Sequence, residues 1–109
     1  MTDSPVRYLC SQLMTLSWEE GATIVNLEEI HETGCVVESE TALPEGADVE
    51  LRCGRVCLEG KIEKTEEHDF GFRTVVSFCH GSTWSLALFR PEHLLDLSAM
   101  KQTASKPLT

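Results

Sequence analysis

The stretch DVELRCGRVCLEGKI, residues 48–62, decides the fold class of this 109-residue chain. Apolar and polar residues alternate through its first half and again after the centre, which is typical of strands with one buried face. Between the halves, Gly54-Arg55 forms a two-residue loop with glycine first, as a type II′ turn requires. The stretch therefore predicts an antiparallel β-hairpin with one face in a core and one in water.

Segments on both sides of this hairpin are also predicted strands, at residues 10–18, 22–27, 35–39 and 70–78. They are rich in alternating or β-branched apolar residues and are bounded by glycine, proline or polar turns. Polar loops are expected at residues 28–34 and 65–69. In the last strand, alternation predicts one shared face for Phe70, Phe72, Thr74, Val76 and Phe78. Strands so closely spaced predict a mainly antiparallel β domain, either a small barrel or a sandwich.

The periodicity changes near the C-terminal end. Ser82 is expected to cap a helix over residues 83–89, in which Trp84 and Leu88 stand four residues apart. Together with Phe89, these two side chains are expected to seal one end of the β domain.

The ends of the chain are expected to lie outside the folded domain. Residues 92–97 are expected to form a further helical turn that ends a single domain over residues 7–97. Residues 1–6 are read as a disordered arm, and residues 98–109 as a flexible polar tail.

The formal net charge of -9 makes anionic binding partners unfavourable. An acidic surface repels phosphate backbones and anionic membranes, so nucleic-acid polymers and membrane insertion are not expected. No apolar run reaches the length of about 20 residues that spans a membrane, and no secretory signal is recognised. A cytoplasmic location with five reduced cysteines is therefore expected.

Three stretches occur in the order and spacing of a known family. They are VNLEEIHETGCVV at 25–37, LPEGADVEL at 43–51, and LEGKI at 58–62 followed by FRTVVSF at 72–78. With them the chain resembles the PilZ domain family. The resemblance implies a six-stranded antiparallel β-barrel with a short C-terminal helix, and a place in bacterial cyclic di-GMP signalling.

The family binds cyclic di-GMP with two motifs, Arg-x-x-x-Arg before the first strand and Asp/Asn-x-Ser-x-x-Gly after the second. By this resemblance the candidate ligand-binding residues are Arg7, Glu29, His31 and Gly34, with Arg73 as a helper. Arginine forks pair with phosphates and stack on guanines. Arg7 is the only arginine before the first strand, and Gly34 alone is kept from the second motif, with Glu29 and His31 replacing Asp/Asn and Ser.

These departures lower the expected affinity. A rival frame starts at Asn26, but it puts Glu28 in place of the serine and His31 in place of the glycine. A charge-assisted hydrogen bond contributes about 1.5–3 kcal/mol. A lost arginine and an altered loop together cost about 3–6 kcal/mol, or about 10²- to 10⁴-fold in affinity. The expected function is a non-enzymatic regulatory or adaptor domain with a protein partner and weak or absent nucleotide binding. The alternative is a genuine cyclic di-GMP receptor that uses Arg7 and the loop at 29–34.

A second alternative is a small metal-binding protein. Cys53, Cys57, Cys79 and His80 supply ligand types that zinc accepts. Alternation puts the first two cysteines on opposite faces of the hairpin, which opposes convergence, so buried thiols and no metal cofactor are expected. His31 and Cys35 lie four residues apart, but neither has an evident partner that would activate it. No catalytic residue is therefore assigned. His31 is expected to be solvated, with its pKa raised by neighbouring carboxylates.

Overall fold

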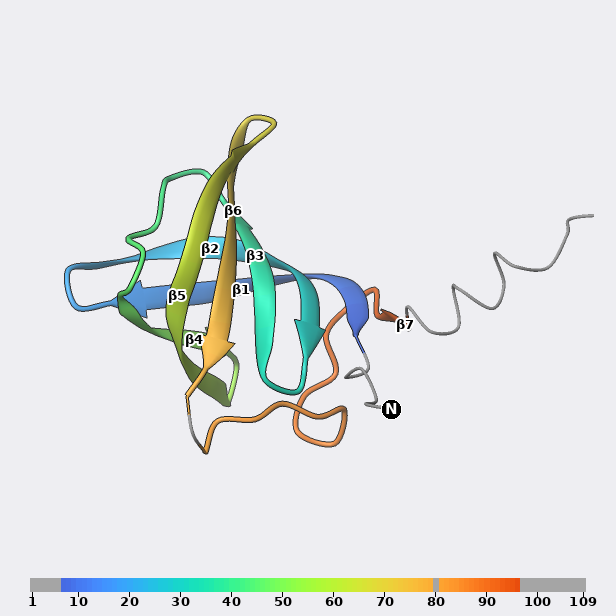
Figure 1. Cartoon of the computed structure of the whole chain (residues 1–109). Helices are drawn as coiled ribbons and strands as arrows, with labels where there is room; N and C mark the ends of the chain where they lie inside the picture. The colour runs from blue at the N-terminus through green and yellow to red at the C-terminus, as the bar shows by residue number, and fades with distance from the viewer. Residues whose placement is uncertain (1–6, 80, 97–109) are drawn as a thin grey trace, which may run out of the picture.

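The computed structural model describes residues 7–79 and 81–96 (Figure 1). The predicted arm at 1–6 and tail at 98–109 lie outside these residues. The strands are β1 (Tyr8–Trp18), β2 (Gly21–His31), β3 (Gly34–Ser39), β4 (Asp48–Cys53), β5 (Val56–His68), β6 (Gly71–Phe78) and β7 (Leu95–Asp96).

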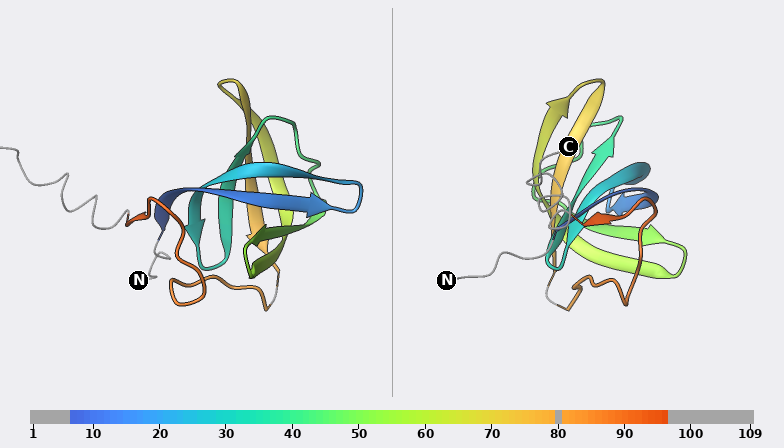
Figure 2. Two further views of the ribbon diagram at one scale, coloured as in Figure 1. Left: turned by 180° about the vertical axis from the view of Figure 1, so that it is seen from behind. Right: turned by 90° about the vertical axis from the view of Figure 1, so that its right-hand side faces the viewer.

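The first six strands form a closed antiparallel barrel. The strand order is β2-β3-β6-β5-β4-β1, and the further pairing of β1 with β2 closes the ring. The two-residue strand β7 pairs with the beginning of β1. Figure 2 shows the strands wrapping around one interior when seen from behind and from the side. The predicted six-stranded β-barrel is therefore confirmed.

The hairpin at residues 48–62 forms as predicted. Cys53 pairs with Val56 across the turn, and Gly54 has a φ of 59°. This left-handed backbone conformation suits glycine because it has no Cβ. Val49, Leu51 and Leu58 are buried, so the alternation identifies the inner face correctly.

The core fills the barrel from all six strands and its two longer connections. Leu16, Leu27, Val37 and Leu51 are fully buried and come from four different strands. Among the described residues the buried apolar side chains of the core are Met14, Leu16, Val25, Leu27, Ile30, Cys35, Val37, Leu43, Val49, Leu51, Leu58, Ile62, Val76 and Trp84. A continuous apolar interior of this kind is the main favourable term in the folding of the domain.

Two predicted loops are strands instead. The loop expected at 28–34 is mostly the end of β2, which stays paired through a register shift between Leu27 and Glu29, so that only Glu32-Thr33 forms the turn. The tip expected at 65–69 is mostly the end of β5, which pairs with β6 up to His68. Main-chain hydrogen bonds keep both polar segments in the sheet.

The predicted shared face of residues 70–78 is correct only in part. Thr74 and Val76 are buried and Phe78 packs against the core. Phe70 instead lies in the turn after Asp69, which has a φ of 53°, and its side chain is fully exposed. A turn interrupts the period of two, so Phe70 does not follow the alternation of β6.

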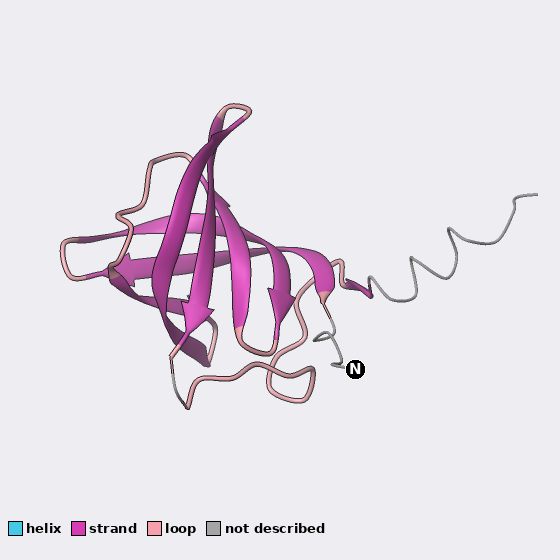
Figure 3. Ribbon diagram, viewed as in Figure 1, coloured by secondary structure: helices cyan, strands magenta, loops and turns pink. Residues whose placement is uncertain are grey.

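The predicted helix over residues 83–89 is not confirmed. Figure 3 shows no helix in the part of the chain that the structure describes, and residues 81–94 run as a loop across one barrel end. The main-chain N–H of Trp84 donates to the carbonyl of Glu32 (3.0 Å), and the Ser82 hydroxyl accepts the Glu59 N–H (3.3 Å) instead of capping a helix. The Trp84 N–H and the Ser82 hydroxyl thus bond to the barrel, and neither takes part in a helix.

The sealing role expected for this segment is confirmed for two side chains. Trp84 is buried and its Nε1–H donates to the Phe89 carbonyl at 2.8 Å, while its ring meets Tyr8 edge-on with centroids 5.4 Å apart. Phe89 packs against the core, whereas Leu88 is largely exposed. The helical turn predicted at 92–97 is also wrong where it is described, because Leu95 begins β7. Across the described ranges, nothing helical is long and apolar enough to cross a membrane.

Candidate ligand-binding site

Arg7 and Glu29 come together at the barrel end where β1 begins and β2 finishes. Leu9 pairs with Glu29 across the two strands, and Arg7 directly precedes the first residue of β1. The Arg7 Nε–H donates to Glu29 Oε2 at 2.7 Å, and Nη2 donates to the same oxygen. The Glu29 side chain is only 7% exposed, against 53% for Arg7. The nearly buried carboxylate of Glu29 therefore binds the guanidinium of Arg7. The family resemblance implied that this guanidinium would bind a phosphate of the nucleotide.

A bulge in β2 changes which side chains face the core beside this glutamate. The register shift between Leu27 and Glu29 places one extra residue in β2 relative to β3. Alternation from Val25 and Leu27 would put Glu29 on the core face, whereas after the extra residue Ile30 takes that face and Glu29 is buried beside it. Ile30 belongs to the core, and Glu29 turns toward Arg7.

His31 ends β2 beside this pair. Its Nδ1 lies 3.4 Å from the Thr33 main-chain nitrogen and 3.3 Å from the Thr33 hydroxyl. Partial burial lowers the pKa of His31, Arg7 lowers it further, and Glu29 opposes them. The predicted rise in this pKa is therefore wrong, because burial and the arginine outweigh the carboxylate.

Gly34 begins β3 directly opposite His31. A Cβ built here would lie 2.6 Å from the carbonyl oxygen of Val76 and 3.3 Å from the His31 ring. Close approach of β3 to the neighbouring strand β6 therefore requires glycine at this position.

Arg73 belongs to another group of ionisable side chains. It lies on β6 opposite Glu38 of β3, and its positive charge acts on Glu28. Burial raises the pKa of Glu28, and a hydrogen bond with Glu38 adds to the rise, whereas Arg73 and His68 lower it. The structure thus unites Arg7, Glu29, His31 and Gly34 but does not place Arg73 with them.

Cys10 is a neighbour of the site that the sequence did not reveal. It lies where the pairing of β1 with β2 shifts register, and its Sγ contacts the Leu27 carbonyl oxygen at 3.6 Å. Burial raises the pKa of this thiol to about 12, with Glu28 and Glu29 adding to the effect. A thiol that stays protonated is a poor nucleophile. No residue pattern marks the bulge, so no sequence signal pointed to Cys10.

The cysteines of the metal alternative do not converge in the described residues. Cys53 packs against the core, whereas Cys57 is exposed on the other face beside Glu50. Within residues 7–79 and 81–96, no three His, Cys, Asp or Glu side chains are grouped to hold a metal ion. His80, the fourth residue of that alternative, lies outside the described residues.

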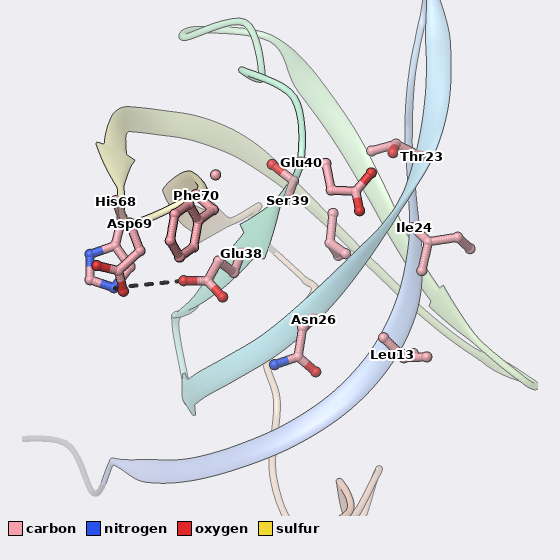
Figure 4. A pocket seen from close by; sticks show the side chains of 12 residues that line it. Leu13, Thr23, Ile24, Asn26, Glu38, Ser39, Glu40, His68, Asp69 and Phe70 are labelled. Atoms are coloured by element: carbon pink, nitrogen blue, oxygen red, sulfur yellow. Dashed lines mark ion pairs between the residues drawn. The ribbon is translucent and has the colours of Figure 1, made fainter.

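A hollow lies on the outer face of the sheet (Figure 4). We call it the outer groove, and its volume is about 730 Å³. It lies between the β1–β2 surface and the tip of the β5–β6 hairpin. Its lining residues are Leu13, Thr23, Ile24, Val25, Asn26, Glu38, Ser39, Glu40, His68, Asp69, Phe70 and Gly71.

Comparison of the sequence with protein-family models and with curated proteins gives no match.

Proposed function

We propose that this chain is a PilZ-like, non-enzymatic regulatory or adaptor domain of bacterial cyclic di-GMP signalling, which acts in the cytoplasm through a protein partner and binds the nucleotide weakly or not at all. The closed six-stranded barrel agrees with the architecture that the resemblance implies. The observation that carries the proposal is the ion pair of Arg7 with Glu29.

The ion pair opposes nucleotide binding in two ways. A phosphate that used Arg7 would have to displace a carboxylate that already accepts two N–H donors from it. The displaced Glu29 would then be a nearly buried charge without its partner, which is costly. Glu28 and Glu32 add negative charge close by in the sequence, and a dianionic ligand is repelled by it.

The genuine receptor remains the alternative, because half of the Arg7 side chain is open to solvent and within reach of a ligand. Thermal unfolding with and without cyclic di-GMP separates the two functions. Ligand at 100 times its dissociation constant stabilises a folded protein by about 2.7 kcal/mol, which raises Tm by roughly 10 °C in a domain of this size. At about 100 µM nucleotide we expect no measurable shift for this chain. A shift of several degrees would favour the receptor.

A pair of variants tests whether Glu29 is the cause. Glu29→Asn restores a residue type of the family motif and releases Arg7, so it is expected to give a larger nucleotide-dependent shift than the unchanged chain. Glu32→Asn removes the same charge from the adjacent turn but leaves the ion pair intact, so it serves as the matched control. Equal behaviour of the two variants would mean that general charge, and not the ion pair, limits binding.

A further inference from the structure

The outer groove carries exposed apolar side chains at both ends. Leu13 of β1 and Ile24 of β2 are 65% and 59% exposed, and Phe70 at the hairpin tip is fully exposed. Figure 4 shows Phe70 on one side of the hollow and Ile24 and Leu13 on the other, with Glu38, Glu40 and Asn26 between them. Large apolar side chains gathered around one hollow are typical of an interaction site.

The middle of the groove is acidic. Glu38 and Glu40 lie there and Asp69 adjoins Phe70, while none of the described lining residues is Lys or Arg. His68 Nε2 lies 3.6 Å from Glu38 Oε2 and 3.5 Å from Asp69 Oδ2. Arg73, opposite Glu38 on β6, offsets part of this charge from outside the lining. The surface is thus complementary to a ligand with positive charge between two apolar groups.

The walls of the groove are held in place by the fold. A Cβ at Gly71 would lie 2.5 Å from the Ser39 carbonyl oxygen, so the base of the hairpin tip is packed closely against the end of β3. The Ser39 hydroxyl donates to the Thr41 carbonyl at 2.7 Å, which fixes the chain beyond β3. A preformed wall lowers the ordering cost of binding.

Main-chain pairing is not available where β2 and β3 meet on the floor of the groove. Over residues 26–30 the strand β2 pairs with both β1 and β3, and β3 pairs with β2 and β6. A peptide cannot extend the sheet at these residues as an added strand, because both edges are already used. Side-chain chemistry must therefore select the ligand there.

We propose that the outer groove binds an extended segment of a partner protein that carries apolar side chains at its two ends and lysine or arginine between them. This inference rests on the proposed adaptor function, since it assigns the partner surface. The apolar ends would contact Phe70 on one side and Leu13 with Ile24 on the other. The cationic centre would pair with Glu38 and Glu40.

Two synthetic peptides test the proposal on the full chain. One is Leu-Ser-Lys-Ser-Lys-Ser-Leu, and the other has both lysines replaced by glutamate. We expect the lysine peptide to bind with a dissociation constant of about 0.1–1 mM and to move amide NMR signals of the groove residues. Phe70→Ala is expected to weaken it about tenfold or more. The double change Glu38→Gln with Glu40→Gln is expected to weaken it about threefold to tenfold.

Leu88→Ala is the matched control variant, because it also removes an exposed apolar side chain but lies in the loop of residues 81–94 at the barrel end. It is expected to bind the lysine peptide like the unchanged chain. Equal binding of both peptides, equal losses in Phe70→Ala and Leu88→Ala, or signal changes centred on Arg7 and His31 would each contradict the proposal.

Two further controls identify other occupants. If dilution of the chain alone moved the same groove signals, a second copy would occupy the groove and the proposal would be wrong. Binding that arose only after removal of residues 97–109, which include Lys101 and Lys106, would make this chain's own tail the occupant and would also overturn it. Tight cyclic di-GMP binding would contradict the proposed function instead, so the two failures can be told apart.

Discussion

Removal of the Arg7 guanidinium is expected to destabilise the fold by a measurable amount. Arg7→Met keeps most of the side-chain stem but leaves the carboxylate of Glu29, which is 7% exposed, without its donors. A hydrogen bond to a charged group contributes about 1.5–3 kcal/mol, and a fully exposed ion pair about 0.2–1 kcal/mol. Because one partner is buried and the other is half in water, we expect Arg7→Met to lower the free energy of unfolding by about 1–3 kcal/mol.

Urea unfolding followed by tryptophan fluorescence measures this change, since Trp84 is buried in the native state. The expected loss lowers the urea midpoint by roughly 1 M at unchanged slope. Glu29→Gln removes the charge but keeps an acceptor oxygen, so its cost is expected to be smaller, and the double variant yields the coupling between the two residues. Arg55→Met, in the exposed hairpin turn, is the control and is expected within about 0.5 kcal/mol of the unchanged chain. If Arg7→Met matched this control, the ion pair would not stabilise the fold, and Glu29 would not hold the guanidinium of Arg7 away from a ligand.

Four more changes test other parts of the structure. The pKa of His31 is lowered in the folded state, so on acidification the unfolded chain protonates this histidine first, and stability should fall as pH drops below about 6.5. His31→Gln should reduce this loss of stability in urea titrations. A His31 pKa above 6.5 by NMR would contradict the expectation. Gly34→Ala should cost about 1–3 kcal/mol because its Cβ would meet a carbonyl oxygen at 2.6 Å, and thermal melting unchanged from the unmodified chain would contradict this. Trp84→Ala should cost about 3–5 kcal/mol by opening the barrel end, whereas Trp84→Phe should recover part of the loss in the same melts. Phe70→Ala should change stability by less than about 0.5 kcal/mol, since its ring is fully exposed, and a larger loss by calorimetry would give Phe70 a role in the fold.

The hairpin at residues 48–62 could be predicted in detail because its local signals agree. Alternation identified the buried Leu51 and Leu58, and Gly54 supplied the turn. The register of the barrel depends on pairings between distant segments, β1 with β4 and β3 with β6, and periodicity carries no information on which strands meet. The resemblance, and not the pattern, suggested six strands in a barrel.

The resemblance suggested the residues of the candidate site but not their arrangement. It grouped Arg7, Glu29, His31 and Gly34 with Arg73 as a helper, and the structure brings the first four to one barrel end. The sequence could not show that Glu29 lies against Arg7, because this contact and the bulge beside it have no residue signature. The sequence also could not give the direction of the His31 pKa shift. Burial, which only the structure shows, outweighs the nearby carboxylate and lowers this pKa.

The helix over residues 83–89 failed because tertiary contacts outweighed a local pattern. Seven residues before a proline form a marginal helix at best. Bonding of the segment to Glu32 and Glu59, with Trp84 buried, favours a loop across the barrel instead. The exposure of Phe70 was missed in a similar way, because a turn at Asp69 breaks the alternation that included it.

Glu29 neutralises the arginine on which nucleotide binding would depend. Calorimetric titration of the full chain with cyclic di-GMP, beside Arg7→Ala, tests this directly. We expect no saturable heat up to about 100 µM nucleotide and no difference between the two proteins. A low-micromolar dissociation constant that is lost in Arg7→Ala would contradict the account and identify the chain as a receptor.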